Sequence, residues 1–263
     1  ELFSKAGIFY SRRIGGTPSG YYDALTLASD SNYTLIKNPG LTQLYNATKF
    51  SGRTKSNLGI GIFNAVTAPM HAELRDKSGN IIKMQTEPLA NYNIIVLDQA
   101  LKNRSYITFT NTNVIRNGSA RDANVSALNL SLFNKANTYQ FLFNGAYSHV
   151  TGADAHNGFS SGISYGKVSG KWQWGIANNM VSPNYDPNDL GFLRSPNIFS
   201  TKLSGAYTQF NPGKLFNFRN YSISFEQTNL LKPFAAQEFK VEADFLHVFK
   251  NFWDVTFLVS SQP

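Results

Sequence analysis

Alternation of side chains with a period of two is the feature that most limits what this chain can fold into. Between residues 139 and 147, the aromatic rings of Tyr139, Phe141 and Phe143 alternate with other side chains such as Gln140 and Asn144. Similar alternation recurs at 159–166, 172–177, 221–226, 238–245 and 253–259. Successive side chains of a β-strand point to opposite faces of a sheet. Because helical spacing is almost absent, the sequence predicts an all-β fold.

Turn-forming residues separate these stretches, for example Ser78-Gly79-Asn80, Asn117-Gly118 and Ser169-Gly170. We expect roughly eleven or twelve strands of about nine to fourteen residues, joined mostly as antiparallel hairpins. One connection, between residues 182 and 196, is long and rich in proline. Residues 1–40 alternate poorly and predict an irregular segment, a loop or an insertion into a lumen. Residues 41–263 predict the strands.

Three features of the strands favour a membrane barrel over a soluble sandwich. The expected strands exceed the usual length of about five or six residues. One face carries polar and charged side chains, and aromatic rings lie near both strand ends, as in the girdles of membrane barrels. The fold class predicted is therefore an antiparallel up-and-down transmembrane β-barrel, with a soluble all-β protein as the alternative. The apolar runs are too short for a membrane-spanning helix.

The alternation also assigns each side chain to a face, because charges are costly in hydrocarbon and aromatic rings are not. The lipid side is expected to hold Tyr139, Phe141, Phe143, Tyr147, Tyr165, Trp172, Trp174, Phe225, Phe239, Val241 and Phe245. The lumen side is expected to hold Gln140, Asn144, Ser164, Gln173, Ser224, Glu238, Lys240, Glu242 and Asp244.

Composition excludes several functional classes. Aromatic residues form 14% of the chain, which argues against disorder. The absence of cysteine excludes disulfides and cysteine-ligated zinc. The formal net charge is +8, but Lys and Arg are scattered, so we expect no nucleic-acid partner. A basic rim or lumen wall facing anionic lipopolysaccharide is the other interpretation of this charge.

Candidate catalytic and metal-binding patterns are weak, and the sequence predicts no enzyme, no cofactor and no metal site. The histidines form no zinc-binding motif. Asp154 with His156 is better explained as a polar loop, and Asp186 with Asp189 as a turn rather than a calcium site. The adjacent pair Ser148-His149 should point to opposite faces of a strand, which argues against a nucleophile and its base.

Several short stretches of the sequence carry a family resemblance. They are Glu1-Leu2-Phe3 with residues 7–15 (GIFYSRRIG), and residues 49–53 (KFSGR), 59–67 (GIGIFNAVT), 87–92 (EPLANY) and 189–194 (DLGFLR). These stretches resemble the DUF5916 family of large outer-membrane proteins of Bacteroidetes. The resemblance implies a C-terminal barrel domain, usually preceded by a carbohydrate-binding-like domain, and a location in the bacterial outer membrane. It implies no established reaction. The chain is expected to be only part of a larger barrel that these residues do not close.

Candidate lumen or gate residues are Arg12, Arg13, Lys49, Arg53, Glu238, Lys240, Glu242 and Asp244. Residues 9–15 are expected inside or at the mouth of the barrel. Arg12 or Arg13 should pair with an acidic side chain there, because a buried arginine needs a partner.

These features lead to three hypotheses for function. The first is an outer-membrane barrel acting as a passage, or as a platform subunit of a cell-surface assembly. Its partners would be outer-membrane lipid, lipopolysaccharide, other surface subunits and carbohydrate bound through a further domain. The alternatives are a soluble carbohydrate-binding module and a membrane-bound hydrolase.

Overall fold

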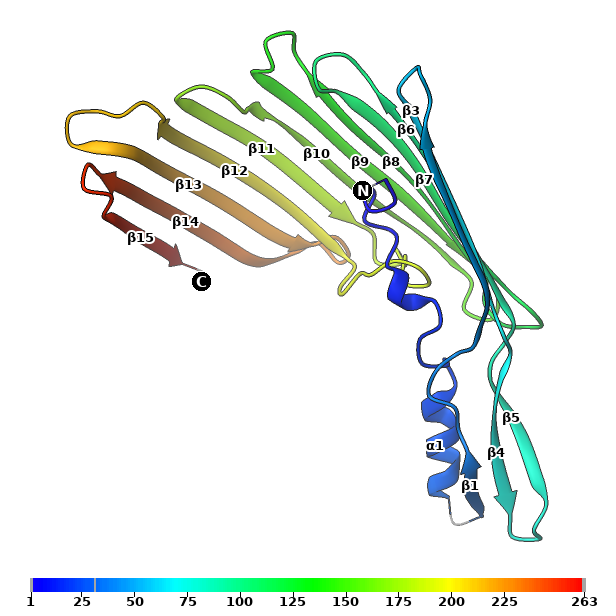
Figure 1. The fold of residues 1–263 in the computed structure, drawn as a ribbon. Helices are drawn as coiled ribbons and strands as arrows, with labels where there is room; N and C mark the ends of the chain where they lie inside the picture. The colour runs from blue at the N-terminus through cyan, green and yellow to red at the C-terminus, as the bar shows by residue number, and fades with distance from the viewer. Residues whose placement is uncertain (1, 31, 262–263) are drawn as a thin grey trace.

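A single large antiparallel sheet dominates the computed structural model, which describes residues 2–30 and 32–261 (Figure 1). Its twelve strands within these ranges follow the order β2-β3-β6-β7-β8-β9-β10-β11-β12-β13-β14-β15. Their bounds are β2 (Leu44–Arg53), β3 (Leu58–Thr67), β6 (Ala90–Ala100), β7 (Tyr106–Arg116), β8 (Ala123–Phe133), β9 (Tyr139–Val150), β10 (His156–Lys167), β11 (Trp172–Val181), β12 (Ile198–Gln209), β13 (Phe216–Leu230), β14 (Ala235–Phe249) and β15 (Asp254–Ser261). The predicted all-β antiparallel fold is confirmed.

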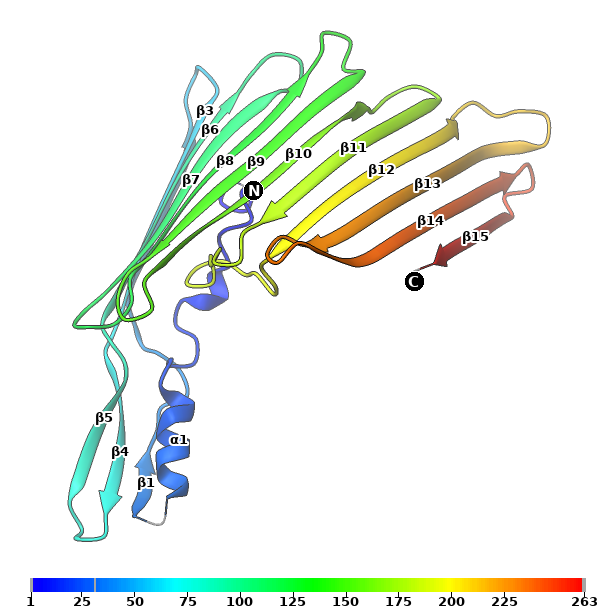
Figure 2. The same cartoon turned by 180° about the vertical axis from the view of Figure 1, so that it is seen from behind.

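The large sheet curves into an open trough rather than a closed cylinder (Figures 1 and 2). Strands β2 and β15 lie at its opposite edges and do not pair with each other. The prediction that the first and last strands of this chain would not close on one another is therefore confirmed for the described residues.

The register between strands separates two faces of the sheet. Residues directly opposite each other on neighbouring strands share a face, as Phe141 does with Tyr165 and Asn144 with Gly162. Followed strand by strand, the register places all eleven predicted lipid-side residues on one face and all nine predicted lumen-side residues on the other. We call the first the outer face and the second the inner face.

A small unit projects from one end of the trough (Figure 1). It consists of helix α1 (Tyr21–Ser29) and a three-stranded sheet of β1 (Tyr33–Lys37), β4 (Met70–Asp76) and β5 (Ile81–Glu87). Ala24 of the helix packs with Ala72 and Leu74 of β4, and this contact holds the unit together. Among the described residues, no helix has the length and apolarity needed to cross a membrane.

This unit differs from the sequence expectation in two respects. Residues 1–40 are not wholly irregular, because they contain α1, β1 and the short 3-10 helix η1 (Ser11–Arg13). Strands β4 and β5 leave the large sheet, although the alternation within residues 41–263 had suggested one continuous sheet. Pro69 and Pro88 stand where the chain leaves and re-enters the large sheet. A proline cannot donate a ladder hydrogen bond, so each interrupts strand pairing.

Two irregular segments lie against the inner face. The N-terminal segment (residues 2–20) runs along the trough, and the long connection (residues 182–197) between β11 and β12 folds back to meet it (Figure 2). Phe3 packs with Tyr92, Ile94 and Val96 of β6. Ile8 packs with Val125 and Ala127 of β8 and with Tyr185 of the connection. These segments position the charged groups described next.

Candidate functional site

The N-terminal segment packs closely against the inner face at Gly61 of β3, which has no side chain. Phe3 is 5% exposed. A Cβ atom added to Gly61 of β3 would lie 2.9 Å from the side chains of both Leu2 and Phe3. Glycine at this position therefore leaves the space that the segment fills.

Asp98 of β6 anchors this segment electrostatically. Its Oδ1 accepts hydrogen bonds from Lys5 Nζ at 2.6 Å and Thr108 Oγ1 at 2.7 Å, and its Oδ2 accepts from Arg53 Nη2 at 2.8 Å. The Asp98 side chain is 1% exposed. A carboxylate buried this deeply requires such partners, and Lys5 is the only one of them that comes from the N-terminal segment.

Cation–π contacts reinforce the same anchor. Lys5 Nζ lies 4.5 Å from the ring centroid of Tyr106 on β7. Lys49 Nζ of β2 lies 4.8 Å from the ring centroid of Phe3. Each partner therefore contributes one ammonium group and one aromatic ring, and such contacts stabilise by about 0.5–2 kcal/mol each.

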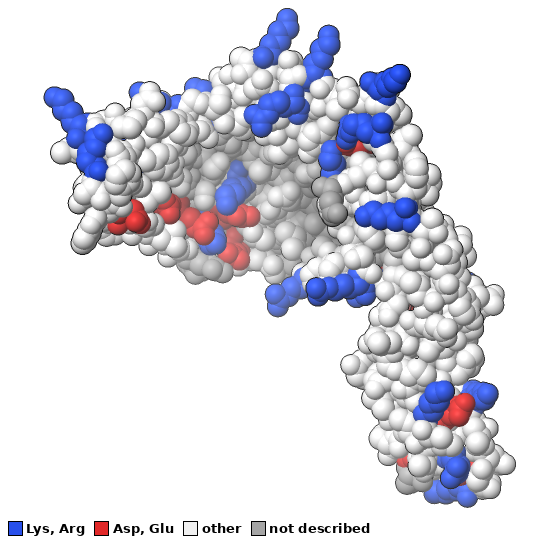
Figure 3. All heavy atoms as spheres, viewed as in Figure 1, with Lys and Arg blue, Asp and Glu red and all other residues white. Residues whose placement is uncertain are grey.

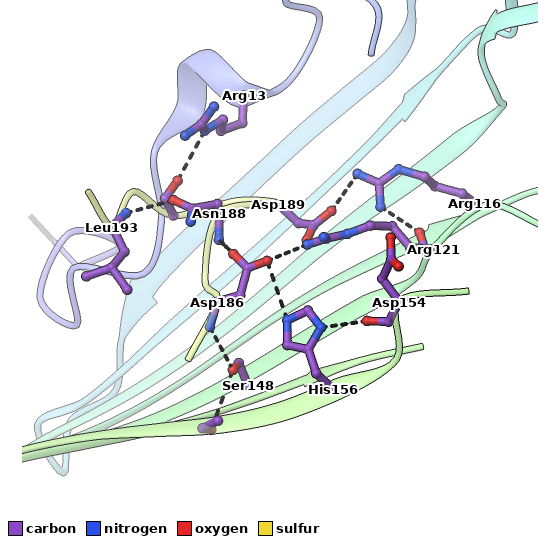
Figure 4. Close-up of polar contacts among 12 residues, drawn as sticks. Arg13, Arg116, Arg121, Ser148, Asp154, His156, Asp186, Asn188, Asp189 and Leu193 are labelled. Carbon is purple, nitrogen blue, oxygen red and sulfur yellow. Dashed lines mark hydrogen bonds and ion pairs between the residues drawn. The ribbon is translucent and has the colours of Figure 1, made fainter. Parts of the chain in front are cut away.

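A second charged group anchors the long connection (Figure 4). Arg121, in the turn between β7 and β8, pairs with Asp186 at 2.8 Å and also with Asp189. Arg116 at the end of β7 binds the other oxygen of Asp189 at 2.7 Å. Two arginines on the sheet thus hold two carboxylates on the connection, and we call these four residues the arginine–aspartate cluster.

Close backbone packing completes this attachment. The Ser148 hydroxyl of β9 accepts a hydrogen bond from the Asp186 backbone N–H at 3.1 Å. A Cβ atom added to Gly158 of β10 would lie only 2.2 Å from the Tyr185 backbone nitrogen. The connection can therefore approach the sheet only because residue 158 has no side chain.

The arginine–aspartate cluster shifts the ionisation of its members. Burial disfavours the charged form of Asp186, but hydrogen bonds from Arg121 and from the Asn188 backbone outweigh it, so the pKa is lowered. Burial likewise opposes the charge of Arg121, yet its two carboxylate partners raise the pKa. Burial, with the charge of Asp186, raises the pKa of Tyr185 to about 12. Arg121 and Asp186 therefore both carry their charges near neutral pH.

The two inner segments also bind each other. The Tyr10 backbone N–H donates to the Leu190 carbonyl at 2.5 Å, and Arg13 Nε donates to the Gly191 carbonyl at 3.2 Å. The Arg13 guanidinium also stacks against the ring of Phe192. The expected acidic partner of Arg12 or Arg13 is not found among the described residues. Both arginines are exposed, so neither needs a buried counter-charge.

The inner face of β12–β14 carries charges of both signs. Lys240 pairs with Glu242 at 2.6 Å, and Lys202 lies 3.6 Å from Glu226. Glu242 and Asp244 line a hollow of about 590 Å³ whose walls also include several serines of β10, β12 and β13. Figure 3 shows acidic and basic side chains gathered within this hollowed face. This half of the trough is therefore polar and open, whereas the N-terminal half is covered.

The structure divides the sequence-predicted lumen residues into separate groups. Lys49 contacts Phe3 of the N-terminal segment, and Arg53 binds Asp98, the carboxylate that holds Lys5. Glu238, Lys240, Glu242 and Asp244 follow β14 on the far side of the trough. The second group lines the open hollow instead.

Sequence reasoning missed the residues that hold the two inner segments. These are Lys5, Asp98, Arg116 and Arg121, with Asp186 and Asp189 interpreted only as a turn or a calcium site. One signal was available, because Asp98 is a lone charge that follows the apolar run of residues 94–97. An isolated carboxylate on a buried strand indicates a partner from elsewhere in the chain.

The other candidate sites show no catalytic or metal-binding geometry. His156 Nδ1 lies 2.6 Å from the Asp154 carbonyl oxygen, and its Nε2 lies 3.7 Å from Asp186. Ser148 is buried on the inner face, whereas His149 points outward and contacts Asn157. Within the described ranges, no group of three or more histidine or acidic residues could hold a metal ion.

Comparison with known proteins identifies the family of this chain. No curated protein matches the chain. The model of a family described as a domain of unknown function, DUF5916, matches residues 1–263. The resemblance seen in the sequence motifs is thus supported over the full length given, and the chain belongs to the DUF5916 family.

Proposed function

We propose that this chain forms part of the wall of a β-barrel in a bacterial outer membrane. In this proposal the outer face contacts lipid, and the inner face borders a polar passage. The N-terminal segment and the long connection obstruct one half of that passage. We propose no enzymatic step.

The contrast between two adjacent rows of side chains carries this proposal. One register row on the outer face is apolar on every strand from β8 to β14, and consists of Leu132, Phe141, Tyr165, Ile176, Leu203, Phe225 and Val241. The neighbouring inner row from β9 to β14 consists of Gln140, Gly166, Gly175, Ser204, Ser224 and Glu242. Apolar-out and polar-in is the pattern of membrane barrels.

The apolar band of the outer face has a boundary at each end. At the end with short turns, Tyr165 lies 6.2 Å from Tyr139 and 5.7 Å from Trp174 between ring centroids. At the end near the small unit, one register row is wholly polar, and consists of Thr48, Asn64, Asn93, Asn113, Asn124, His149 and Asn157. Rings and amides of this kind suit the two water–lipid interfaces.

The distance between these boundaries fits a membrane. Tyr139 and His149 are ten residues apart on β9. A strand rises about 3.3 Å per residue, which gives roughly 33 Å along the strand. A tilt of about 40° reduces this to a height of roughly 25 Å, close to the apolar band of outer-membrane barrels.

The two edge strands, β2 and β15, each have only one neighbouring strand among the described residues. The unpaired backbone groups of β2 and β15 would each be costly in hydrocarbon. We therefore propose that both edges pair with additional strands in the membrane, so that these residues are one part of a larger barrel.

Two of the alternatives fit the geometry less well. A soluble sandwich needs a second sheet over the apolar face, and the described residues provide none over the outer face. A serine hydrolase is disfavoured because Ser148 and His149 lie on opposite faces. A platform for a surface assembly remains a second candidate, supported by the projecting unit of α1, β1, β4 and β5 (Figure 1).

Cysteine labelling tests the proposal, since the sequence contains no cysteine. Ile163→Cys on the outer face and Ser164→Cys on the inner face are adjacent residues of β10. With an environment-sensitive dye at each site, spin-labelled lipid should quench the dye at 163 and leave the dye at 164 unquenched. A water-soluble quencher should give the reverse result. Equal quenching of the two dyes by the spin-labelled lipid, or by the water-soluble quencher, would contradict the proposal.

A further inference from the structure

The turns at one end of the large sheet form a basic rim. Each of six turns at this end contains Lys or Arg, and none of them contains Asp or Glu. These turns are residues 54–57, 101–105, 134–138, 168–171, 210–215 and 250–253. Figure 3 shows basic side chains along this edge, which is uppermost in the view. The connections at the opposite end carry acidic and basic residues together, so only the basic rim favours contact with an anionic surface.

A groove of about 970 Å³ lies on the outer face beside the basic rim. One wall is a row of aromatic rings that crosses β11 to β14. The distances between ring centroids are 4.7 Å from Trp172 to Tyr207, 6.1 Å from Tyr207 to Tyr221 and 5.9 Å from Tyr221 to Phe245. Trp172 directly follows Lys171 of the rim, so this wall marks the boundary between the rim and the apolar band.

Small side chains leave the floor of the groove open. Gly205 of β12 lies opposite Trp174 of β11, and Ala243 of β14 lies in the same row, across Ile223 of β13. A Cβ atom added to Gly205 would have its nearest atom 3.9 Å away, so no other part of the described chain fills this space. The volume falls within the range of about 300–1,000 Å³ that is typical of ligand sites. The groove can therefore hold an extended hydrocarbon chain against the sheet.

Arg219 of β13 adds a positive charge to this apolar groove. Its side chain is half-buried, and its Nε donates to Gln209 Oε1 at 2.7 Å. Its guanidinium lies 5.9 Å from the ring centroids of both Tyr207 and Phe216. No ion pair within the described ranges includes Arg219, and neither of its Nη atoms hydrogen-bonds to a described residue. A guanidinium held by aromatic rings without a carboxylate partner can offer both Nη groups to an oxyanion such as phosphate.

We propose that this groove binds an acidic phospholipid, whose phosphate accepts hydrogen bonds from Arg219 and whose acyl chain lies over Gly205 and Ala243. The proposal rests on the proposed lipid contact of the outer face and names the lipid that is bound there. Charge complementarity selects the head group, because Arg219 and the basic rim attract anionic lipids. One guanidinium and one groove suit the single phosphate of a phospholipid better than lipid A, which has two phosphates and more acyl chains.

Tryptophan fluorescence tests this site, because Trp172 and Trp174 line the groove and Trp253 is the one other tryptophan of the sequence. The Trp253→Phe protein is reconstituted in phosphatidylcholine bilayers that contain the same fraction of brominated phosphatidylglycerol or brominated phosphatidylcholine. Bromine quenches tryptophan on contact, so the loss of fluorescence reports the bound lipid. The relative binding constant should favour phosphatidylglycerol by about fivefold. Unlabelled phosphatidylglycerol should displace the brominated lipid, whereas inorganic phosphate should not.

Variants in the Trp253→Phe background assign the effect to the groove. Arg219→Gln should abolish the preference for phosphatidylglycerol, and Arg219→Lys should retain part of it because the charge remains. Arg194→Gln is the matched control, since it removes an exposed arginine from the opposite end of the sheet and should leave the preference unchanged. If Arg219→Gln fails to fold, Ala243→Phe fills the groove instead and should also abolish the preference.

Equal quenching by the two brominated lipids would overturn the phospholipid site while leaving the lipid contact of the outer face intact. Quenching by neither lipid would contradict that lipid contact itself, and the site with it. An equal loss of preference in Arg219→Gln and Arg194→Gln would attribute the effect to overall charge and overturn the role of Arg219. Displacement of brominated phosphatidylglycerol by lipid A, but not by unlabelled phosphatidylglycerol, would overturn the assignment to a phospholipid.

Discussion

Lys5 and Asp98 are separated by 93 positions in the chain, yet they form an ion pair of 2.6 Å between the N-terminal segment and strand β6 on the inner face. Arg53 contacts the same carboxylate, so removing the lysine leaves Asp98 with a counter-charge on β2. The large sheet therefore does not depend on this ion pair, whereas the seating of the segment does.

Lys5→Ala should release the N-terminal segment without unfolding the sheet. A hydrogen bond to a charged group contributes about 1.5–3 kcal/mol, and the variant loses one together with a cation–π contact. Hydrogen exchange of residues 2–14 should become faster, while exchange in β6–β9 stays as in the wild type. Lys55→Ala, in the exposed turn between β2 and β3, is the control. Unchanged exchange in the segment would contradict the anchor role of Lys5.

Arg121→Ala should loosen the long connection more than Arg121→Lys. The guanidinium contacts both Asp186 and Asp189, and an ammonium group keeps the charge but not the planar fork. We expect limited proteolysis to cut residues 182–197 fastest in the alanine variant and at an intermediate rate in the lysine variant. Lys135→Ala, in another turn, should be cut at the wild-type rate. Identical cleavage of all four proteins would contradict this role.

Low pH should release the long connection, residues 182–197, from the sheet. The pKa of Asp186 in the folded protein is lowered, so its stabilising effect is fully present above the unfolded value of about 3.9. The effect is lost as the pH falls below this value and through the lower folded pKa. Cleavage of residues 182–197 by an acid-active protease should therefore rise below about pH 4. Asp186→Asn should raise cleavage at neutral pH and reduce its pH dependence, whereas an unchanged dependence would refute the assignment.

Gly158→Ala should displace the connection by steric overlap alone. The new Cβ would lie 2.2 Å from the Tyr185 backbone nitrogen, and overpacking of this kind costs about 1–3 kcal/mol. Gly205→Ala is the matched control, because the nearest atom to its Cβ is 3.9 Å away. Denaturant unfolding should show a loss of stability for the first variant only. An equal loss of stability in both variants would mean that replacing any glycine within a strand is destabilising, and that overlap with Tyr185 is not the cause.

Arginine substitutions on the two faces of β9 test the facing of the sheet. Phe143→Arg should destabilise the protein by about 2–4 kcal/mol if the outer face lies in hydrocarbon, because residue 143 is near the middle of the apolar band between Tyr139 and His149. Asn144→Arg should cost less, because residue 144 is exposed within the trough and the variant loses only the hydrogen bond with Asn129. Reversible refolding into lipid measures both. Greater damage from Asn144→Arg would indicate that the aromatic face is packed inward.

The sequence predicted those parts of the fold that depend on local chemistry. Alternation assigned Phe141 and Glu242 to opposite faces correctly, because successive side chains of a strand point to opposite faces of the sheet. Helix α1 was missed because it has only nine residues and buries a single one, Ala24, so it leaves almost no periodic signal.

Contacts between distant segments could not be predicted in the same way. The departure of β4 and β5 from the sheet is marked in sequence only by Pro69 and Pro88, since the alternation within each strand is like that of its neighbours. The partners of Asp98 and Asp186 depend on chain segments that fold back across the sheet. Sequence spacing carries no information about such contacts.

The meeting of Arg13 with Gly191 links positions 178 residues apart, and this separation determines the order in which the molecule can assemble. The N-terminal segment precedes all of these strands in the chain, but part of its binding surface is the long connection, which follows β11. Closing so long a loop is entropically unfavourable until the intervening hairpins exist. Phe3 and Lys5 can bind as soon as β6 exists, whereas Tyr10 and Arg13 must wait for the long connection that follows β11. The segment therefore binds the sheet in two stages, and its last contacts form only after the strands behind it have been built.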